Sequence, residues 1–365
     1  MLVFCADTHL CERTWASRPT LVNDAFYSFE QIVNYAINSG AEGVVCAGDM
    51  FDVRKPPSAV LRFFRDQISK LEDKRIAFYY IQGQHDLVSP TWASTVSDWP
   101  VLLDSAGTIK LDTGFSIAGF SWTPVDQLAD RLPDVYGADV AVLHQVWVEF
   151  MGDHVATEGR LADVKECNTI FTGDYHHNSI LSIDNIVGDK LTVVSPGSTN
   201  LRKIDEPARK YFYTADIGSA GIEFNRMDLD TRAVTVVHVN DAADIESAAA
   251  SVEKFVTANQ HAVLGKPIVR VVAAATVPET YKRFNQQFSE RAHLFFKIVD
   301  VCSEDDLIVD VADISNIGVK PEDFLSLFVD CQSPDFKPLQ RLISAADYKQ
   351  ELQKLRQERL NINAT

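Results

Sequence analysis

The chain has 365 residues, of which 46% are hydrophobic and 23% are charged, and its formal net charge is −17 at pH 7. This balance is typical of a globular protein of about two domains and excludes a disordered or fibrous chain. The acidity also excludes a uniformly basic DNA-binding surface. A nucleic acid would therefore have to be held by local cations, by metal ions or by a partner protein.

Neither a membrane anchor nor a secretion signal is expected. No stretch of about 18 apolar residues occurs, which argues against a transmembrane helix. The N-terminal MLVFCADTHL enters a strand pattern directly, without the basic and small-residue segments of a signal peptide. The six cysteines include no Cys-x-x-Cys pair, so we expect reduced thiols and no structural zinc site. Together these features predict a cytoplasmic protein.

The first 95 residues alternate apolar strand patterns with amphipathic helix patterns. In the first helical pattern, VNDAFYSFEQIVNYAINSG, apolar residues recur at spacings of three and four, and Gly40 stands where a helix C-cap would fall. Strand patterns become more frequent after about residue 95, which indicates a second sheet. For residues 1–235 we therefore expect an α/β (α+β) fold, namely a β-sandwich flanked by helices.

A smaller unit is expected after residue 235. Strand and helix patterns follow the order β-α-β-α-β over residues 236–303, which predicts a small α/β domain. Residues 304–365 are expected to form a tail with a helical pattern and an apolar stripe. The tail helix either packs on its own domain or docks on a partner protein, and the pattern alone does not decide between these alternatives.

Short polar clusters stand just after five of the apolar strand patterns. Because loops at the carboxyl ends of strands in one sheet meet in space, we expect these clusters to form one site. Taken singly, each would be interpreted as an ordinary turn, cap or surface residue, but five of them in this order favour a shared function. The clusters are Asp7 with His9, Gly48 with Asp49, Gly83 to Asp86, His144, and Gly173 to His176.

The side chains in these clusters have the chemistry of a divalent metal site. A mixed set of carboxylate, amide and imidazole groups suits manganese, iron or zinc. Seven candidate ligands are too many for one ion. They suit two ions about 3.5–4 Å apart that share a carboxylate, clamp a phosphate and activate a water. The seven are Asp7, His9, Asp49, Gln84, His144, Asp174 and His176.

This motif set resembles that of the calcineurin-like metallophosphoesterases over about residues 1–215. It consists of Asp-x-His, Gly-Asp-x-x-Asp, a Gly-Asn-His-Asp-like segment, a strand-end His and a Gly-His-x-His-like segment. Within that superfamily, GDMFDVRKPPSAVLRFF and VVSPGSTNLRKIDEPARKYFY are similar to segments of the SbcD-type DNA repair nucleases. The small unit resembles their capping domain. The whole chain resembles most a bacteriophage form, a recombination endonuclease subunit, which would act in the cytoplasm of the host cell.

The resemblance implies a role for each matching residue. His85 would lie beside the scissile phosphate and would not bind metal, and Asp86 would orient the His85 ring. Asp49 would bridge the two ions. The implied ligands are Asp7, His9, Asp49 and His176 for the first ion, and Asp49, Gln84, His144 and Asp174 for the second.

Two positions depart from the common motif. Gln84 stands where Asn is usual, so the amide oxygen is kept but one methylene is added. Asp174 stands where His is usual, which replaces a neutral nitrogen by a charged oxygen and favours a harder ion such as manganese or magnesium. The expected cofactors are therefore two divalent ions, Mn²⁺ with Mg²⁺ as the alternative. A weakened second metal, in a slow or partner-dependent enzyme, is the competing interpretation.

The resemblance also implies partners. DNA would be the substrate, and an SbcC-type coiled-coil ATPase would be the partner subunit. The chain would form a homodimer, with the helix near 56–72 as the candidate contact, and no membrane would be involved. Exposed cations near the site are candidates for contacts with the DNA backbone, although they are equally well interpreted as solvated surface charges. These cations are Arg54, Lys55, Arg202 and Lys203.

The leading hypothesis is an Mn²⁺-dependent exo- and endonuclease that hydrolyses DNA backbone phosphodiesters and works with the ATPase in recombination, repair or end processing. One alternative is a phosphoesterase acting on a small nucleotide, a sugar phosphate or a phosphoprotein, which the acidic charge favours. Another is a scaffold subunit with a degenerate, weakly active site, for which the two departures from the motif are the only support.

Overall fold

A computed structural model describes residues 1–15, 20–112, 114–152, 157–218, 221–274, 279–299 and 307–310. The chain divides into two compact units. The first comprises residues 1–235 and 255–268, and the second comprises residues 236–254 and the described residues from 269 to 310. The tail helix predicted within residues 304–365 lies outside the described residues.

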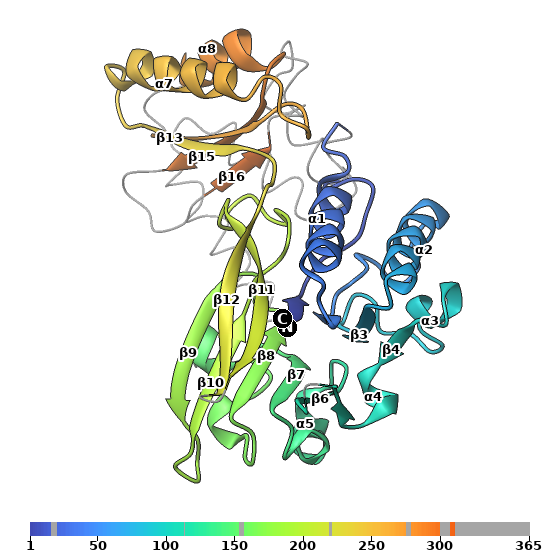
Figure 1. Ribbon diagram of the computed structural model, residues 1–365. Helices are drawn as coiled ribbons and strands as arrows, with labels where there is room; N and C mark the ends of the chain where they lie inside the picture. Colours follow the sequence, from blue (N-terminus) through green and yellow to red (C-terminus); the bar gives the residue numbers. More distant parts are fainter. Residues whose placement is uncertain are drawn as a thin grey trace, which may run out of the picture. The chain divides into compact units, whose positions relative to one another are not determined.

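Two six-stranded sheets form the first unit (Figure 1). In one, strands β1 to β4 run parallel and β11 and β12 continue the sheet antiparallel. In the other, β6, β7, β8 and β10 run parallel between antiparallel edge strands β5 and β9. The first sheet, in spatial order, is β12 (Gly221–Leu229), β11 (Lys210–Gly218), β1 (Leu2–Cys5), β2 (Gly43–Ala47), β3 (Ala77–Ile81) and β4 (Pro100–Leu102). The second is β5 (Ile109–Lys110), β6 (Ser116–Gly119), β7 (Val140–His144), β8 (Thr169–Gly173), β10 (Lys190–Ser195) and β9 (Ser179–Asp184).

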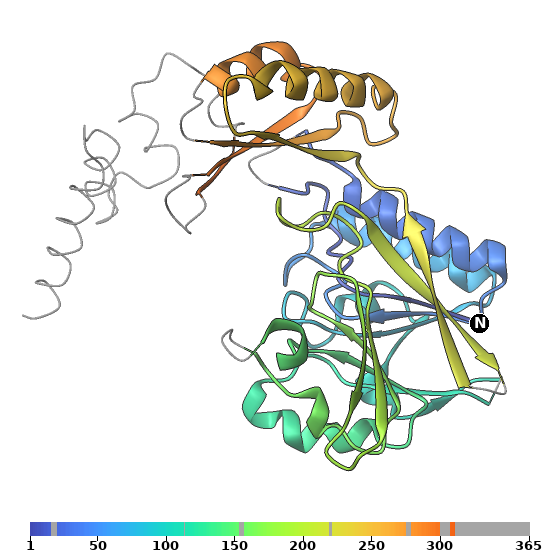
Figure 2. The ribbon, with the colours of Figure 1, turned by 90° about the vertical axis from the view of Figure 1, so that its left-hand side faces the viewer.

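Helices cover both outer faces of this sandwich, and the expected sandwich fold is confirmed. The two longest, α1 (Asp24–Ser39) and α2 (Ser58–Asp73), lie along one face of the first sheet (Figure 2). Among the described helices, none combines the length and apolarity needed to cross a membrane. The shorter helices of this unit are α3 (Trp92–Val96), α4 (Leu103–Ala106), α5 (Val125–Arg131), η1 (Leu132–Val135), α6 (Val148–Met151) and η2 (Leu161–Asp163).

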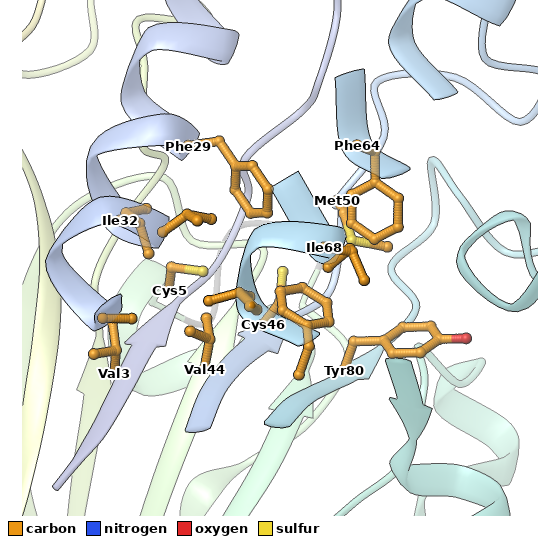
Figure 3. Packing of buried hydrophobic residues seen from close by; sticks show 14 of the residues in the cluster. Val3, Cys5, Phe29, Ile32, Val44, Cys46, Met50, Phe64, Ile68 and Tyr80 are labelled. Atoms are coloured by element: carbon orange, nitrogen blue, oxygen red, sulfur yellow. The ribbon is translucent and has the colours of Figure 1, made fainter. Parts of the chain in front are cut away.

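Burial on both faces explains why the strands of the first sheet read as continuous apolar runs. Every residue of β1 and β2 is buried. On the helix side, Phe29 of α1 and Phe64 of α2 face Cys5 and Cys46 of the strands (Figure 3). Phe4, Val45, Phe171 and others fill the space between the two sheets. Removing this apolar area from water supplies about 25 cal/mol per Å² and is the main term that stabilises the layers.

Helix α1 ends as its sequence predicts. Gly40 adopts a left-handed conformation with φ 64°, and its N–H lies within reach of the Ala36 and Ile37 carbonyl groups. A residue with a side chain would be strained there, so glycine closes the helix at little cost. The buried face of the helix also matches the expected spacing, with Phe29, Ile32 and Val33 fully buried.

The second unit contains a four-stranded sheet in the order β13-β14-β15-β16 and two helices. Along the chain its first five elements follow the expected order β-α-β-α-β. They are β13 (Val234–Val239), α7 (Asp244–Ala258), β14 (Ile268–Ala274), α8 (Glu279–Phe288) and β15 (His293–Val299), and β16 (Leu307–Asp310) pairs antiparallel with β15.

A buried ion pair joins the start of α1 to the segment before β13. The guanidinium of Arg232 donates to both carboxylate oxygens of Asp24, at 2.5 and 2.9 Å, and also to the carbonyl of Lys266. Both side chains are at most 5% exposed. Asp24→Ala would leave a buried, uncompensated cation, so we expect it to lower the free energy of unfolding by about 3–5 kcal/mol in urea titrations.

An exposed ion pair on neighbouring helices provides the control. Lys70 and Glu30 are 3.0 Å apart, but their side chains are 41% and 44% exposed. Glu30→Ala should therefore lower the free energy of unfolding by only about 0–1 kcal/mol. If Asp24→Ala and Glu30→Ala lowered the free energy of unfolding equally, the structural role assigned to the Asp24–Arg232 pair would be contradicted.

Candidate metal centre

The carboxyl ends of β1, β2, β7 and β8 meet at one edge of the sandwich, as expected from the polar clusters. Asp7 follows β1 and Asp49 follows β2, and the Asp7 N–H donates to the Gly48 carbonyl at 3.1 Å. From the other sheet, His144 ends β7, and the Asp174 N–H donates to both Asp7 carboxylate oxygens at 3.1 Å. Side chains from two sheets and four strands therefore converge on one buried cluster.

The backbone is strained at this cluster. Asp7, His9, Asp49 and Asp174 all have positive φ, between 42° and 75°. They are four of the seven non-glycine residues with positive φ in the described part of the chain. Each such residue costs about 1–3 kcal/mol, and strain of this kind collects at functional sites, where the fold holds a side chain in a required direction.

Close packing against the cluster explains one of the glycines in the motifs. A Cβ atom built on Gly83 would overlap the Asp49 carboxylate and would lie 2.5 Å from His144 Nε2. A side chain at this position would therefore displace both groups. Gly83 brings its loop against the site because it has no side chain.

The three buried or half-buried histidines present the same nitrogen to the centre. His144 Nδ1 donates to the Ala47 carbonyl at 2.7 Å, and His176 Nδ1 is 2.7 Å from Glu206 Oε1. His9 Nδ1 lies 3.4 Å from Asp52 Oδ1. With Nδ1 directed at an oxygen acceptor, Nε2 of each ring is the nitrogen left to bind a metal ion or, without one, a proton, as is usual for metal-ligating histidines.

Those Nε2 atoms face carboxylates and one another. His9 Nε2 and His176 Nε2 are only 3.2 Å apart, and both can reach one ion at the usual metal–nitrogen distance of about 2.1 Å. Asp49 Oδ2 is 3.6 Å from Nε2 of both His9 and His144, so it stands between the two halves of the site. Asp7 Oδ1 lies 3.8 Å from His176 Nε2 and 4.0 Å from His144 Nε2.

Three overlapping groups of ligand atoms could therefore each hold an ion. They are Asp7 with His9 and His176, Asp7 with Asp49 and His144, and His9 with Asp49 and His85. The first two groups together use five of the seven ligands predicted from the sequence. Asp7 belongs to both, so its carboxylate contacts both halves of the site, whereas the sequence assigned the bridging position to Asp49 alone.

The buried carboxylates need positive charge close to them. Burial raises the pKa of Asp7 to about 6, although His144 and His176 oppose the rise. Burial also acts to raise the pKa of Asp49, but His144 and His9 outweigh it and hold the value well below the usual range. The pKa of His144 is raised well above its usual value because Asp49 outweighs the effect of burial. A divalent cation would supply the charge that a proton on His144 otherwise provides.

The two unusual residues, Gln84 and Asp174, bind each other. Gln84 Nε2 donates to Asp174 Oδ2 at 2.6 Å, and Gln84 Oε1 lies 2.8 Å from His144 Nε2. The amide oxygen therefore points to the same place as the His144 nitrogen, as a ligand would. The longer Gln84 side chain and the Asp174 carboxylate fit together because the Gln84 amide nitrogen donates a hydrogen bond to that carboxylate.

The structure corrects the expected contact between Asp86 and His85. Asp86 is buried, and its carboxylate accepts main-chain N–H groups of Gly83, Met50 and Phe51 at 2.8, 2.8 and 3.2 Å. The His85 ring instead donates from Nδ1 to the Asp52 carbonyl at 2.9 Å. Adjacent residues point in different directions in this loop, so Asp86 shapes the loops around the site and does not hold the catalytic candidate.

The cations proposed to contact DNA divide into two kinds. Arg54, Lys55 and Lys203 are exposed, and contacts between them and DNA stay a prediction. Arg202 is only 13% exposed and pairs with the Asp52 carboxylate, which also approaches His9. Its charge is therefore already compensated by Asp52, and a contact between Arg202 and DNA also stays a prediction.

Sequence analysis did not identify Glu206. This residue follows β10 by eleven positions, is 3% exposed, and lies 2.7 Å from His176 Nδ1. Its other oxygen accepts from Ser198 Oγ, the Arg202 N–H and Lys210 Nζ. The hydrogen bond from His176 and the charge of Lys210 outweigh burial and hold the pKa of Glu206 below its usual range. Only the Glu-x-x-x-Lys spacing hinted at a pair.

We expect Glu206→Gln to weaken Mn²⁺ binding by about 10- to 100-fold, because Glu206 fixes the ring direction and basicity of His176. Isothermal titration with Mn²⁺ measures the effect, and a thermal melt of the metal-free protein checks that the variant folds. Glu72→Ala removes an exposed glutamate on α2 and serves as the control. An unchanged affinity in Glu206→Gln would show that the Glu206–His176 contact has no part in binding metal.

Known proteins resemble the part of the chain that carries this centre. Residues 1–178 match the family model for calcineurin-like phosphoesterases. All seven predicted metal ligands lie within the matched residues, so this part of the chain is similar to calcineurin-like phosphoesterases.

Proteins similar to this chain include DNA repair proteins. The chain is 26% identical over 248 residues to the DNA double-strand break repair protein Mre11 of Methanosarcina acetivorans, covering 63% of this chain but 39% of that protein. It is 22% identical over 298 residues to Mre11 of Sulfolobus acidocaldarius, covering 76% and 75%. It is 24% identical over 295 residues to the uncharacterized metallophosphoesterase YhaO of Bacillus subtilis, covering 76% and 69%. The chain thus spans well under half of the Methanosarcina protein.

Proposed function

We propose that the chain is the nuclease subunit of a DNA-processing complex and hydrolyses backbone phosphodiesters with two divalent ions, Mn²⁺ or alternatively Mg²⁺. One observation carries the proposal. The Nε2 atoms of His9, His144 and His176 converge on the carboxylates of Asp7 and Asp49, while their Nδ1 atoms are directed at oxygen acceptors. The similarity to two Mre11 proteins supports DNA as the substrate.

The proposed chemistry assigns separate tasks to the residues of the chain. Ions bound at the centre would polarise the phosphate and lower the pKa of an attacking water. His85 is 53% exposed, and its Nε2 lies 4.0 Å from Asp49 Oδ2, so it borders the metal ligands on the solvent side. The hydrogen bond from Nδ1 to the Asp52 carbonyl fixes the direction of the ring. A proton on Nε2 could then be given to the leaving oxygen or stabilise charge on the phosphate.

The partner, the dimer and the roles of the other segments are proposed on the resemblance. An SbcC-type ATPase would hold the DNA and so compensate for the net charge of −17. Residues 236–303 would cap the nuclease domain, and residues 304–365 would dock on the ATPase in the cytoplasm. Deletion of residues 336–365 should abolish ATPase binding in a pull-down with the purified partner, and unchanged binding would remove this assignment.

Two observations favour other functions. The acidic charge favours a small phosphoester or phosphoprotein substrate. The hydrogen bond between Gln84 and Asp174 engages two of the four ligands assigned to the second ion, which favours a weakly active scaffold subunit.

A cleavage assay distinguishes the three functions, namely DNA nuclease, phosphoesterase on a small substrate, and scaffold subunit. The full chain with linear double-stranded DNA and Mn²⁺ should release nucleotides, and metal chelation should stop the release. Hydrolysis of a nucleotide or phosphoprotein but never of DNA would support the small-substrate function. No hydrolysis of any of these, even with the ATPase present and with less than one ion bound per chain, would support the scaffold.

A further inference from the structure

Three aromatic rings stack beside the metal centre. Tyr175 stacks on Phe150, with centroids 4.7 Å apart and planes at 11°, and on His177, with centroids 5.3 Å apart and planes at 26°. No ring contact joins Phe150 to His177 in the described part of the chain, so Tyr175 lies between them. Phe150 and Tyr175 are half-buried, whereas His177 is exposed. The stack therefore ends in solvent at the His177 ring.

The stack is fixed to the metal centre by the chain itself. Tyr175 stands between Asp174 and His176, two of the predicted ligands. The hydroxyl of the buried Ser195 donates to the Tyr175 carbonyl at 3.0 Å and approaches the His177 carbonyl at 3.3 Å. Tyr175 and His177 are therefore held directly next to predicted metal ligands along the chain.

An exposed cation is held by Asn178, the residue that follows the ring at the solvent end of the stack. Asn178 follows His177, and its Oδ1 accepts from Arg226 Nη1 at 3.2 Å. The Arg226 guanidinium also lies 4.5 Å from the centroid of the Tyr211 ring. An accessible flat ring beside a positioned guanidinium is the chemistry that binds a nucleotide of a single strand, because the ring takes the base and the cation meets a phosphate.

We propose that the Phe150–Tyr175–His177 stack is a nucleobase subsite, in which a base of single-stranded DNA next to the scissile phosphate stacks on the exposed face of His177. The proposal rests on the proposed nuclease function. Every base has a π-face, so the subsite accepts any sequence but requires a base. It also requires that the strand be unpaired at this position, which selects frayed or opened DNA ends.

Fluorescence of 2-aminopurine tests the subsite without cleavage. Single-stranded oligonucleotides with this base at successive positions are bound to the full chain in EDTA at low salt. We expect quenching at one position in the wild type, and loss of that quenching with about tenfold weaker binding in His177→Ala. His177→Phe should restore both, because it keeps a ring. His261→Ala removes another exposed histidine outside the stack and should change nothing.

Cleavage in Mn²⁺ gives an independent readout. His177→Ala should slow cleavage of an oligonucleotide with a base at the quenched position about tenfold and leave cleavage of the matching abasic oligonucleotide unchanged. Equal slowing of both substrates, or wild-type binding without quenching at any position, would overturn the subsite. Quenching by a wild-type chain that never cuts DNA would instead overturn the nuclease function and keep the subsite.

Discussion

Asp49→Asn should abolish DNA cleavage, with a loss of at least about 10³-fold, or about 4 kcal/mol of transition-state stabilisation. Asp49 Oδ2 lies 3.6 Å from Nε2 of both His9 and His144, so it faces both halves of the site and is placed to be shared by two ions. An amide lacks the charge needed to hold two ions on one oxygen. We therefore expect the number of Mn²⁺ ions per chain to fall as well, as measured by metal analysis after gel filtration.

The fold should survive this change. Asparagine keeps an oxygen that can accept the His85 N–H, which Asp49 Oδ1 now accepts at 3.0 Å. Removing one buried negative charge also relieves repulsion with Asp7. The loss of attraction between Asp49 and the His144 and His9 rings outweighs this relief, so the melting temperature of the metal-free variant should lie below that of the wild type. Asp73→Asn, at the exposed end of α2, is the matched control for activity. Full cleavage by Asp49→Asn would exclude Asp49 as the carboxylate shared by two ions.

His85→Ala should lower the rate of DNA cleavage by about 10²- to 10⁴-fold while the chain keeps both ions. The side chain is 53% exposed and borders the centre, and its Nδ1 is already bonded to the Asp52 carbonyl. The rate is measured in single-turnover cleavage of linear DNA with Mn²⁺. Metal content is measured on the same sample.

The metal content decides between two roles for His85, since its ring also belongs to one of the three possible ligand groups, with His9 and Asp49. A variant that loses activity together with one ion would identify His85 as a ligand and contradict its assignment to the phosphate. His238→Ala, which removes an exposed histidine of β13, controls for the loss of an imidazole as such.

Local sequence patterns were sufficient to predict much of the fold and the convergence of the site residues. Continuous apolar runs predicted the buried strands, and Gly40 predicted the end of α1. Polar residues at strand ends predicted the cluster, because parallel strands bring their carboxyl ends to one edge. Asp7, Asp49 and His144 meet there for that reason.

Contacts between loops could not be predicted in the same way. The partner of His176 is Glu206, thirty residues later along the chain, and nothing in the local pattern fixes the path of that loop. The His85 ring bonds to the main-chain carbonyl of Asp52, and a carbonyl carries no sequence signal. The sequence suggested that Arg202 is an exposed cation, but in the fold its guanidinium pairs with the Asp52 carboxylate.

The two-ion centre is tested most directly by electron paramagnetic resonance of the wild-type chain titrated with Mn²⁺. We predict that two ions bind per chain and that their spectrum is that of an exchange-coupled pair, because a carboxylate oxygen such as Asp49 Oδ2 is shared between them. The same titration of Asp49→Asn should show no coupled pair. A wild-type chain that saturates with one ion, or that shows only the signal of isolated Mn²⁺, would contradict the two-ion centre.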